Sequence, residues 1–240
     1  VSKIYKAKGR PDFNPLIVHL RDIDKAKEYV ETPKAALNLA NAFWPGPLTM
    51  VLPKLEECPI SEIVSAGLDT LAIRAPSHPI AHAILEVSDL PLAAPSANVS
   101  GTLSPTSAHH ISDELRKNID GIIDGGPCDI GLESTIVSVS NDEIIILRPG
   151  SIGQEELTQA TGLPVNFYQG SDITAPGQLS RHYAPNSKLR INAFSPEEDE
   201  FMIGFGAVGG DLNLSVAGNL EEAAANLFSM LKAADQSENK

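Results

Sequence analysis

Several familiar signals are absent from this 240-residue sequence, and each absence disfavours a class of function. No apolar run approaches the roughly 20 residues that a membrane-spanning helix needs, so a membrane protein is not expected. No Walker phosphate loop occurs, which disfavours the P-loop nucleotide-binding enzymes. No Gly-x-Ser-x-Gly elbow surrounds any serine, which disfavours a serine hydrolase.

Positive charge is also scarce, because 18 Lys and Arg residues stand against 31 Asp and Glu residues and give a net charge of −13. Extensive nucleic-acid binding needs a basic face that displaces counterions, so this balance disfavours it. The few cations held at rigid turns are correspondingly stronger clues. The two cysteines, Cys58 and Cys128, lie far apart and match no metal-binding spacing; we expect buried, reduced thiols and a cytoplasmic location.

Short strand-like and helix-like runs alternate over residues 1–164, a pattern that predicts one α/β domain. Strands are expected at residues 15–20, 48–52, 71–73, 92–94, 121–124, 135–139 and 144–147. Helices are expected at residues 23–30, 33–44, 79–87, 107–117 and 154–160. Residues 1–8 read as the tail of an amphipathic helix with Ile4 inward and the lysines outward, so we expect a segment to be missing before it.

Residues 165–186 differ in character, because Gly and Pro interrupt a stretch with little periodicity. This stretch is predicted to be an interdomain linker with a functional role, since it is longer than most loops within a domain. Residues 187–240 are predicted to form part of a smaller C-terminal α/β domain, with strands at 188–193 and 201–205 and a helix at 219–234. Because so short a segment makes a thin domain, its C-terminal end is also expected to be incomplete.

The turn that begins at Lys8 is the first candidate site. Two prolines fix φ angles in Lys8-Gly-Arg-Pro-Asp-Phe-Asn-Pro-Leu-Ile-Val-His19, so Lys8 and Arg10 would project from a preorganised loop that suits phosphate. Asn14 is a further hydrogen-bonding group, and alternation places His19 on the same strand face as Ile17. A solvated turn and a structural core histidine are the competing interpretations.

Four other strand ends carry polar groups. Ser96 and Asn98 follow an apolar strand, Ser134 and Thr135 follow a glycine-rich loop, and single arginines end two further strands, at Arg74 and Arg148. Taken singly, each is equally well an ordinary turn or a surface arginine. Taken together, they form an inventory of cations, hydroxyls and amides with no carboxylate or histidine cluster. That inventory suits anion binding, as in phosphoryl or nucleotidyl transfer.

Six motifs in this order resemble the threonylcarbamoyl-AMP synthase family, with the YrdC-like fold in its long two-domain form. The motifs are KAKGRPDFNPLIVHL, FWPGPLTMVL, TLAIRAPSHP, APSANVSG, DGGPCDIGLESTIVSV and ILRPGSI, and SRHYAP follows in the predicted linker. The resemblance implies an α/β fold: a twisted mixed sheet around a basic cavity, with a smaller C-terminal α/β domain. It also implies a nucleotidyltransferase, which makes L-threonylcarbamoyladenylate from L-threonine, bicarbonate and ATP and releases pyrophosphate. That product serves threonylcarbamoyl modification of adenosine 37 in tRNA.

The resemblance also assigns roles to residues. Lys8 and Arg10 would be the catalytic cations. The ATP-binding residues would be Arg10, Asn14, Thr70, Ser96, Asn98, Ser104, Arg148 and Tyr183. The threonine-binding residues would be His19, Arg74, Ala94 and Ser134. Arg181, His182 and Tyr183 would form a lid over the cavity. Mg²⁺ is expected with ATP, and no side-chain metal ligands are predicted.

The expected partner is the tRNA threonylcarbamoyl transferase that uses the product, with no stable direct binding of nucleic acid. The family also has an upstream Pro-Thr-Glu-Thr-type motif that this sequence lacks, so we expect weak or absent turnover by residues 1–240 alone. Three alternatives stay open at this point. They are a double-stranded RNA-binding module of the same fold, carbamoyl-adenylate chemistry in hydrogenase maturation, and a non-catalytic regulatory relative.

Overall fold

The computed structural model describes residues 1–178 and 183–237 of the chain. The described residues group into two compact units. The sheet unit comprises those of Val1–Lys6, Arg10–Pro95 and Glu133–Ser180, and the second unit those of Ala7–Gly9, Ser96–Leu132 and Arg181–Lys240. The domain limits at residues 164 and 186 stay a prediction.

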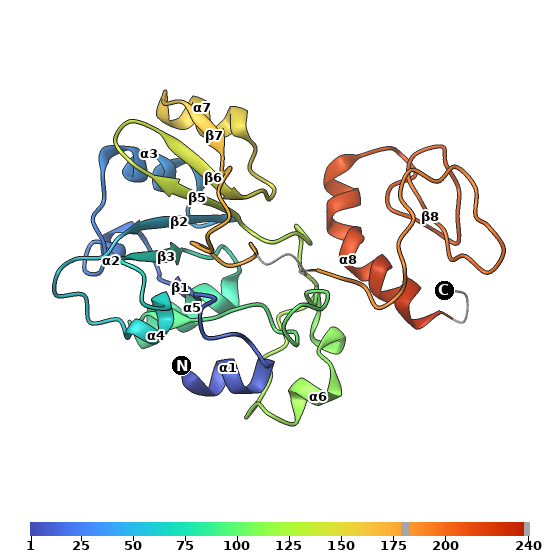
Figure 1. Cartoon of the computed structure of the whole chain (residues 1–240), viewed down its shortest axis with the longest axis horizontal. Helices are drawn as coiled ribbons and strands as arrows, with labels where there is room; N and C mark the ends of the chain where they lie inside the picture. The colour runs from blue at the N-terminus through green and yellow to red at the C-terminus, as the bar shows by residue number, and fades with distance from the viewer. Residues whose placement is uncertain (179–182, 238–240) are drawn as a thin grey trace. The chain divides into compact units, whose positions relative to one another are not determined.

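A seven-stranded mixed sheet forms the centre of the sheet unit, with strand order β4-β1-β3-β2-β5-β6-β7 (Figure 1). The strands are β1 Ile17–His19, β2 Leu48–Pro53, β3 Thr70–Arg74, β4 Leu92–Ala93, β5 Thr135–Val139, β6 Ile144–Arg148 and β7 Val165–Phe167. Parallel pairs (β1–β3, β2–β5, β6–β7) alternate with antiparallel pairs (β1–β4, β2–β3, β5–β6). The predicted α/β fold with a mixed sheet is therefore confirmed, and β7 occupies the first residues of the predicted linker.

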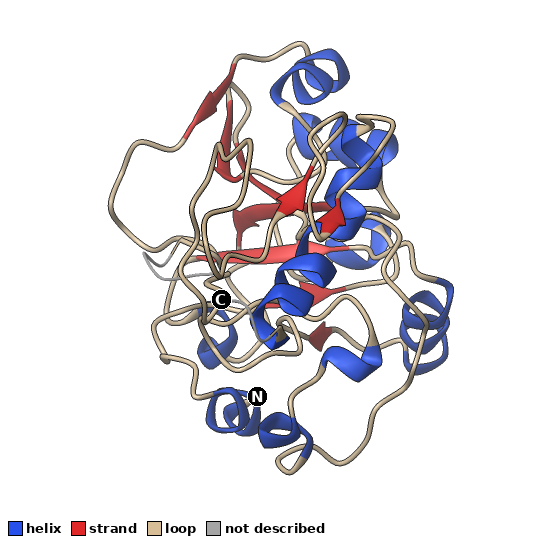
Figure 2. Cartoon of the chain, turned by 90° about the vertical axis from the view of Figure 1, so that its right-hand side faces the viewer, coloured by secondary structure: helices blue, strands red, loops and turns tan. Residues whose placement is uncertain are grey.

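Short helices connect these strands, as Figure 2 shows with helices in blue and strands in red. They are α1 Ser2–Lys8, α2 Ile23–Ala26, α3 Lys34–Phe43, α4 Glu62–Ser65, α5 Pro79–Ser88 and α7 Gln154–Thr161. Within the part of the chain that is described, no helix is long and apolar enough to cross a membrane.

The expected burial of the thiols is wrong, because Cys128 is exposed and Cys58 is only half-buried.

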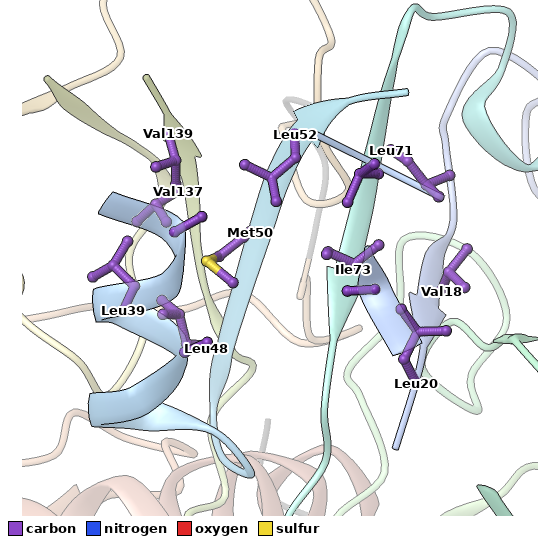
Figure 3. Packing of buried hydrophobic residues seen from close by; sticks show 14 of the residues in the cluster. Val18, Leu20, Leu39, Leu48, Met50, Leu52, Leu71, Ile73, Val137 and Val139 are labelled. Atoms are coloured by element: carbon purple, nitrogen blue, oxygen red, sulfur yellow. The ribbon is translucent and has the colours of Figure 1, made fainter. Parts of the chain in front are cut away.

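One face of the sheet is packed against helices and holds the main hydrophobic core. Strand residues two positions apart share this face, as period-2 alternation requires. The strand and flanking residues of this core are Leu16, Val18, Leu20, Leu48, Met50, Leu52, Leu71, Ile73, Val137, Val139, Ile144 and Ile146. In Figure 3, Leu39 of α3 lies beside Leu48 of β2 and Val137 of β5. We call this face the packed face.

The other face of the sheet is polar at one end. Ile17, Val51, Ala72 and Ile136 form a small second cluster on it, which Ala175 of the predicted linker covers. The same alternation places His19, Thr49 and Arg74 on this face. We call it the site face, because most of the predicted site residues of the sheet unit lie on it or next to it.

The second unit contains η1 Ala108–His110, α6 Asp113–Arg116, β8 Ile203–Gly204, β9 Leu212–Asn213 and α8 Leu220–Gln236. The single helix expected at 107–117 is wrong: it is broken into η1 and α6. The physical reason is Ser112, whose hydroxyl accepts a hydrogen bond from the Leu115 amide and so caps a new helix.

Two expected strands are also wrong, because residues 121–124 and 188–193 form no strand in the described chain. Among the described residues, neither stretch belongs to either of the two sheets, so its backbone joins no hydrogen-bonded ladder. Leu189 and Ile191 instead line an apolar cavity of about 630 Å³ together with residues of α8. The predicted final helix is confirmed as α8, and β8 occupies part of the predicted strand 201–205.

A glycine-rich segment begins at Gly204, the last residue of β8. Gly204, Gly206 and Gly209 match Gly-x-Gly-x-x-Gly. The segment leads into β9, which pairs in parallel with β8, and not directly into a helix. It therefore lacks the helix N-terminus that a dinucleotide-binding loop presents to phosphate.

Candidate active site

Arg10 organises the turn that leads into β1. Its guanidinium donates to the Asn14 carbonyl (Nε, 3.1 Å), the Asn14 Oδ1 (Nη2, 2.7 Å) and the Pro15 carbonyl (Nη2, 2.6 Å). Burial lowers the pKa of Arg10; Tyr5 and Glu133 oppose that shift, while the positive charge of Arg148 adds to it. Arg10 and Arg148, the two predicted phosphate-binding arginines, therefore lie within electrostatic reach of each other.

Asn14 is 1% exposed, yet its Nδ2 has no hydrogen-bond partner among the described residues. A buried amide donor without a partner is costly, which makes it a marker of a site that a ligand completes. Its position next to Arg10 agrees with the role in nucleotide binding predicted for both residues.

His19 and Arg74 are register partners on β1 and β3. The Arg74 Nε donates to the Gly46 carbonyl at 2.9 Å, which fixes the side chain at the strand end. Burial lowers the pKa of His19 to about 4, and the neighbouring Arg74 charge acts in the same direction. The imidazole is therefore neutral at pH 7, and its buried Nδ1 has no hydrogen-bond partner in the described chain.

Arg148 and Ser134 form a third group of predicted site residues, after Arg10 with Asn14 and His19 with Arg74. The Arg148 guanidinium donates to the Ser134 carbonyl (Nε, 3.1 Å; Nη2, 2.7 Å) and to its hydroxyl (3.0 Å). The Ser134 hydroxyl also bonds to that of Thr49 at 2.7 Å. Arg148 is 6% exposed, and its Nη2 lies 3.7 Å from Glu133 Oε2. Thr49 and Glu133 were missed by sequence reasoning, although both lie within the quoted motifs.

A β-bulge puts Arg148 on the site face. Simple alternation along β6 would send it to the packed face with Ile144 and Ile146. The register, however, shifts by one residue, because Val137 pairs with Ile146 whereas Ile136 pairs with Arg148. The extra residue, Leu147, changes the phase of the strand, so Arg148 shares the face of its partner Ile136.

The other predicted residues of the sheet unit are less central. Thr70 lies on the same face as Arg74 but at the opposite end of β3, about 13 Å away at the usual rise per residue. Ala94 lies just after β4, and its amide donates to the Ile17 carbonyl at 3.0 Å. The sheet unit thus brings together Arg10, Asn14, His19, Arg74, Ser134 and Arg148.

In the second unit, Lys8 organises the Pro-Ser-x-Asn segment. Lys8 was expected to point outward, but it is 5% exposed. Its Nζ donates to the carbonyls of Ser96 and Asn98 and to the Asn98 Oδ1. The Ser96 hydroxyl donates to the same Oδ1 at 2.6 Å, while the Asn98 Nδ2 donates to the Thr102 carbonyl at 2.8 Å. These bonds give Lys8 a positioning role beside its predicted catalytic one.

The remaining predicted residues are placed as follows. Ser104 is buried in the second unit. The Tyr183 ring stacks on Phe228 of α8, with ring centroids 5.4 Å apart. Arg181 and His182, predicted for the lid, lie outside the described residues. The roles assigned to all site residues stay predictions.

Comparison with known proteins decides the family. The Sua5–YciO–YrdC family model, described as "Telomere recombination", matches residues 1–150. The chain belongs to the Sua5–YciO–YrdC family. A second family model, "Threonylcarbamoyl-AMP synthase, C-terminal domain", matches residues 152–240, which agrees with the long form of the Sua5–YciO–YrdC family.

Two curated relatives of this Sua5–YciO–YrdC chain carry the name threonylcarbamoyl-AMP synthase. The Bacillus subtilis protein is 46% identical over 85% of this chain and 60% of its own length. The Pyrococcus abyssi protein is 40% identical over 98% of this chain and 76% of its own length. The chain thus spans about three fifths of the Bacillus relative. The crystal structure of P. abyssi Sua5 complexed with L-threonine has a TM-score of 0.85 and 38% identity, over 99% of this chain and 76% of that one.

Proposed function

We propose that this chain carries the active site for making L-threonylcarbamoyladenylate from L-threonine, bicarbonate and ATP, with release of pyrophosphate. The main support is its 46% and 40% identity to proteins named threonylcarbamoyl-AMP synthase. The site face adds physical support, because arginines, hydroxyls and a neutral histidine are the groups that hold phosphates and an amino acid.

The reaction needs binding and charge neutralisation more than acid–base catalysis. The deprotonated amine of threonine combines with bicarbonate to form a carbamate and water. A carbamate oxygen then attacks the α-phosphorus of ATP while pyrophosphate leaves. Arg10 and Arg148 would offset negative charge on the phosphates as the bond to pyrophosphate breaks. Burial is the main cause of the lowered pKa of Arg10, and the charge of Arg148 adds to it; a bound anion would offset the repulsion between the two arginines.

Threonine would bind next to these arginines, at His19, Arg74 and Ser134. Arg74 offers a fixed guanidinium for the carboxylate. The His19 Nδ1 offers a buried group whose hydrogen bond is still to be made. The P. abyssi Sua5 crystal structure is a complex with L-threonine, which supports an amino-acid site in this fold.

Mg²⁺ would enter with the nucleotide. The site side chains are guanidinium, amide, hydroxyl and imidazole groups around one carboxylate, a set that fits phosphate better than a hard cation. Phosphate oxygens and water would therefore hold the ion, and the arginines would bind the phosphate oxygens that Mg²⁺ leaves uncovered.

The labile adenylate would pass in the cytoplasm to a transferase that modifies adenosine 37 of tRNA. With a net charge of −13 this chain is ill suited to hold tRNA itself, so that task would fall to the transferase.

Binding of the substrates tests this proposal directly. Calorimetric titration with MgATP, with and without threonine and bicarbonate, should show binding of the nucleotide and of the amino acid. Mass spectrometry of the same mixtures should detect threonylcarbamoyladenylate only when all three substrates are present. A chain that binds neither ATP nor threonine would contradict the proposal, and D-threonine provides the matched control ligand.

A further inference from the structure

Glu133 is a carboxylate among cations at the site face. Its Oε2 lies 3.7 Å from the Arg148 Nη2, and its side chain is only 22% exposed. Its negative charge also reaches Arg10 and His19. This carboxylate opposes the charge of ATP and of bicarbonate. Besides Arg148, a positively charged group of a ligand could pair with it.

A positive and a negative side chain both act on His19. Its register partner, Arg74, is a cation, and Glu133 is an anion. The imidazole itself is neutral, with a buried Nδ1 that makes no hydrogen bond within the described residues. The site face therefore presents a guanidinium and a neutral polar ring in register, and the negative charge of Glu133 acts on that ring.

This arrangement matches a free α-amino acid. Such a molecule is a zwitterion at neutral pH, with a carboxylate and an ammonium group attached to the same α-carbon. A guanidinium pairs with the carboxylate, and a carboxylate side chain pairs with the ammonium. ATP and bicarbonate carry no cationic group of their own, and phosphate oxygens and water would hold the Mg²⁺ that accompanies ATP, so neither anion would pair with Glu133.

We propose that Glu133 binds the α-ammonium group of the amino-acid substrate, while Arg74 binds its carboxylate. This inference rests on the proposed function for the identity of the substrate. It goes beyond that function by assigning the ammonium to one residue. The competing role, in which Glu133 only holds Arg148 in place, is an outcome of the test.

The test compares L-threonine with 3-hydroxybutyrate, which has a four-carbon chain with the same hydroxyl position but no amino group. The unaltered chain should bind threonine at least about 10-fold more tightly than 3-hydroxybutyrate, the factor expected of one charge-assisted contact. Equal affinities would overturn the inference without any variant.

The Glu133→Gln variant gives the second arm. It should weaken threonine binding by about 10- to 100-fold and leave 3-hydroxybutyrate binding within about twofold. Glu133→Asp keeps the charge and should bind threonine better than Glu133→Gln does. Glu143→Gln, which alters an exposed carboxylate of the same unit, is the matched control.

The outcomes separate the two proposals. If the unaltered chain binds threonine and Glu133→Gln binds it equally well, the inference fails and the proposed function stands. An equal loss for both ligands in Glu133→Gln would mean that Glu133 positions Arg148, and it would also overturn the inference. No threonine binding by the unaltered chain would refute the proposed function first.

Discussion

The same strands form the packed face and the site face, but the two faces have different roles. On the packed face, Leu48, Met50 and Ile73 have no exposed surface and belong to one apolar cluster. On the site face, the buried Nδ1 of His19 has no hydrogen-bond partner among the described residues. The positive charge of Arg148 repels that of Arg10. Burial stabilises the first face, whereas the second retains unsatisfied polar groups and like charges.

The packed face therefore contributes mainly to the stability of the sheet, and the site face mainly to ligand binding. Because side chains alternate along a strand, adjacent residues such as Ile73 and Arg74 contribute to opposite faces. A substitution on the packed face should change the free energy of unfolding, and one on the site face should mainly change ligand affinity. Single substitutions on each face can test that division.

The largest effect is expected from Ile73→Ala on the packed face. Ile73 is fully buried, so the substitution should leave a cavity and lower the free energy of unfolding by about 2–5 kcal/mol. Urea denaturation followed by circular dichroism measures this change. Val87→Ala, at a position that is 90% exposed, is the control and should change little. A loss below about 1 kcal/mol for Ile73→Ala would show that the packed face is not the main source of stability.

Arg10→Ala should act mainly on ligand affinity. The loss of a charged donor should weaken ATP binding by about 1.5–3 kcal/mol, measured by calorimetry. Because Arg10 also bonds to Asn14 and Pro15, the melting temperature of the variant must be recorded alongside. Arg116→Ala, at an exposed arginine, is the control. An unchanged affinity for ATP would mean that the phosphates bind elsewhere.

His19 should make the stability of the chain sensitive to acid. Its pKa is about 4 in the folded chain against the usual 6.5, so the unfolded chain takes up a proton that the folded chain resists. The contribution is fully present above about pH 6.5 and is lost as the pH falls towards 4. Between pH 7 and pH 5 the loss should be about 2 kcal/mol.

Urea denaturation at pH 7 and at pH 5 measures this loss. His19→Gln removes the titrating group, so the variant should lose less stability between the two pH values than the unaltered chain does. His109→Gln, at an exposed histidine, is the control and should behave like the unaltered chain. Equal losses in the unaltered chain and His19→Gln would rule out His19 as the source.

The sequence alone was sufficient to predict which side chains of the central strands share a face, and it correctly placed Ile17 and His19 on the same one. The bulge at Leu147 could not be read from β6, because it depends on how β6 pairs with a strand that has its own register. The sequence did not identify Glu133 and Thr49 as site residues, because a glutamate or a threonine near the start of a strand is common and indicates no particular function. The expected strand at 188–193 failed because a strand needs a partner, which local sequence does not specify.

The smallest effect is expected from Thr49→Val, which tests whether the two faces differ within one strand. Thr49 is fully buried on the site face between Leu48 and Met50 of the packed face, and its hydroxyl bonds to that of Ser134. Valine has nearly the same shape, so the substitution removes one hydrogen bond, at a cost of about 1 kcal/mol of unfolding free energy. Because Ser134 also accepts from Arg148, the loss of its Thr49 partner should loosen both residues and weaken threonine binding severalfold. Thr49→Ser keeps the hydroxyl and should retain that affinity, so equal weakening in both variants would point to lost packing instead of a lost hydrogen bond.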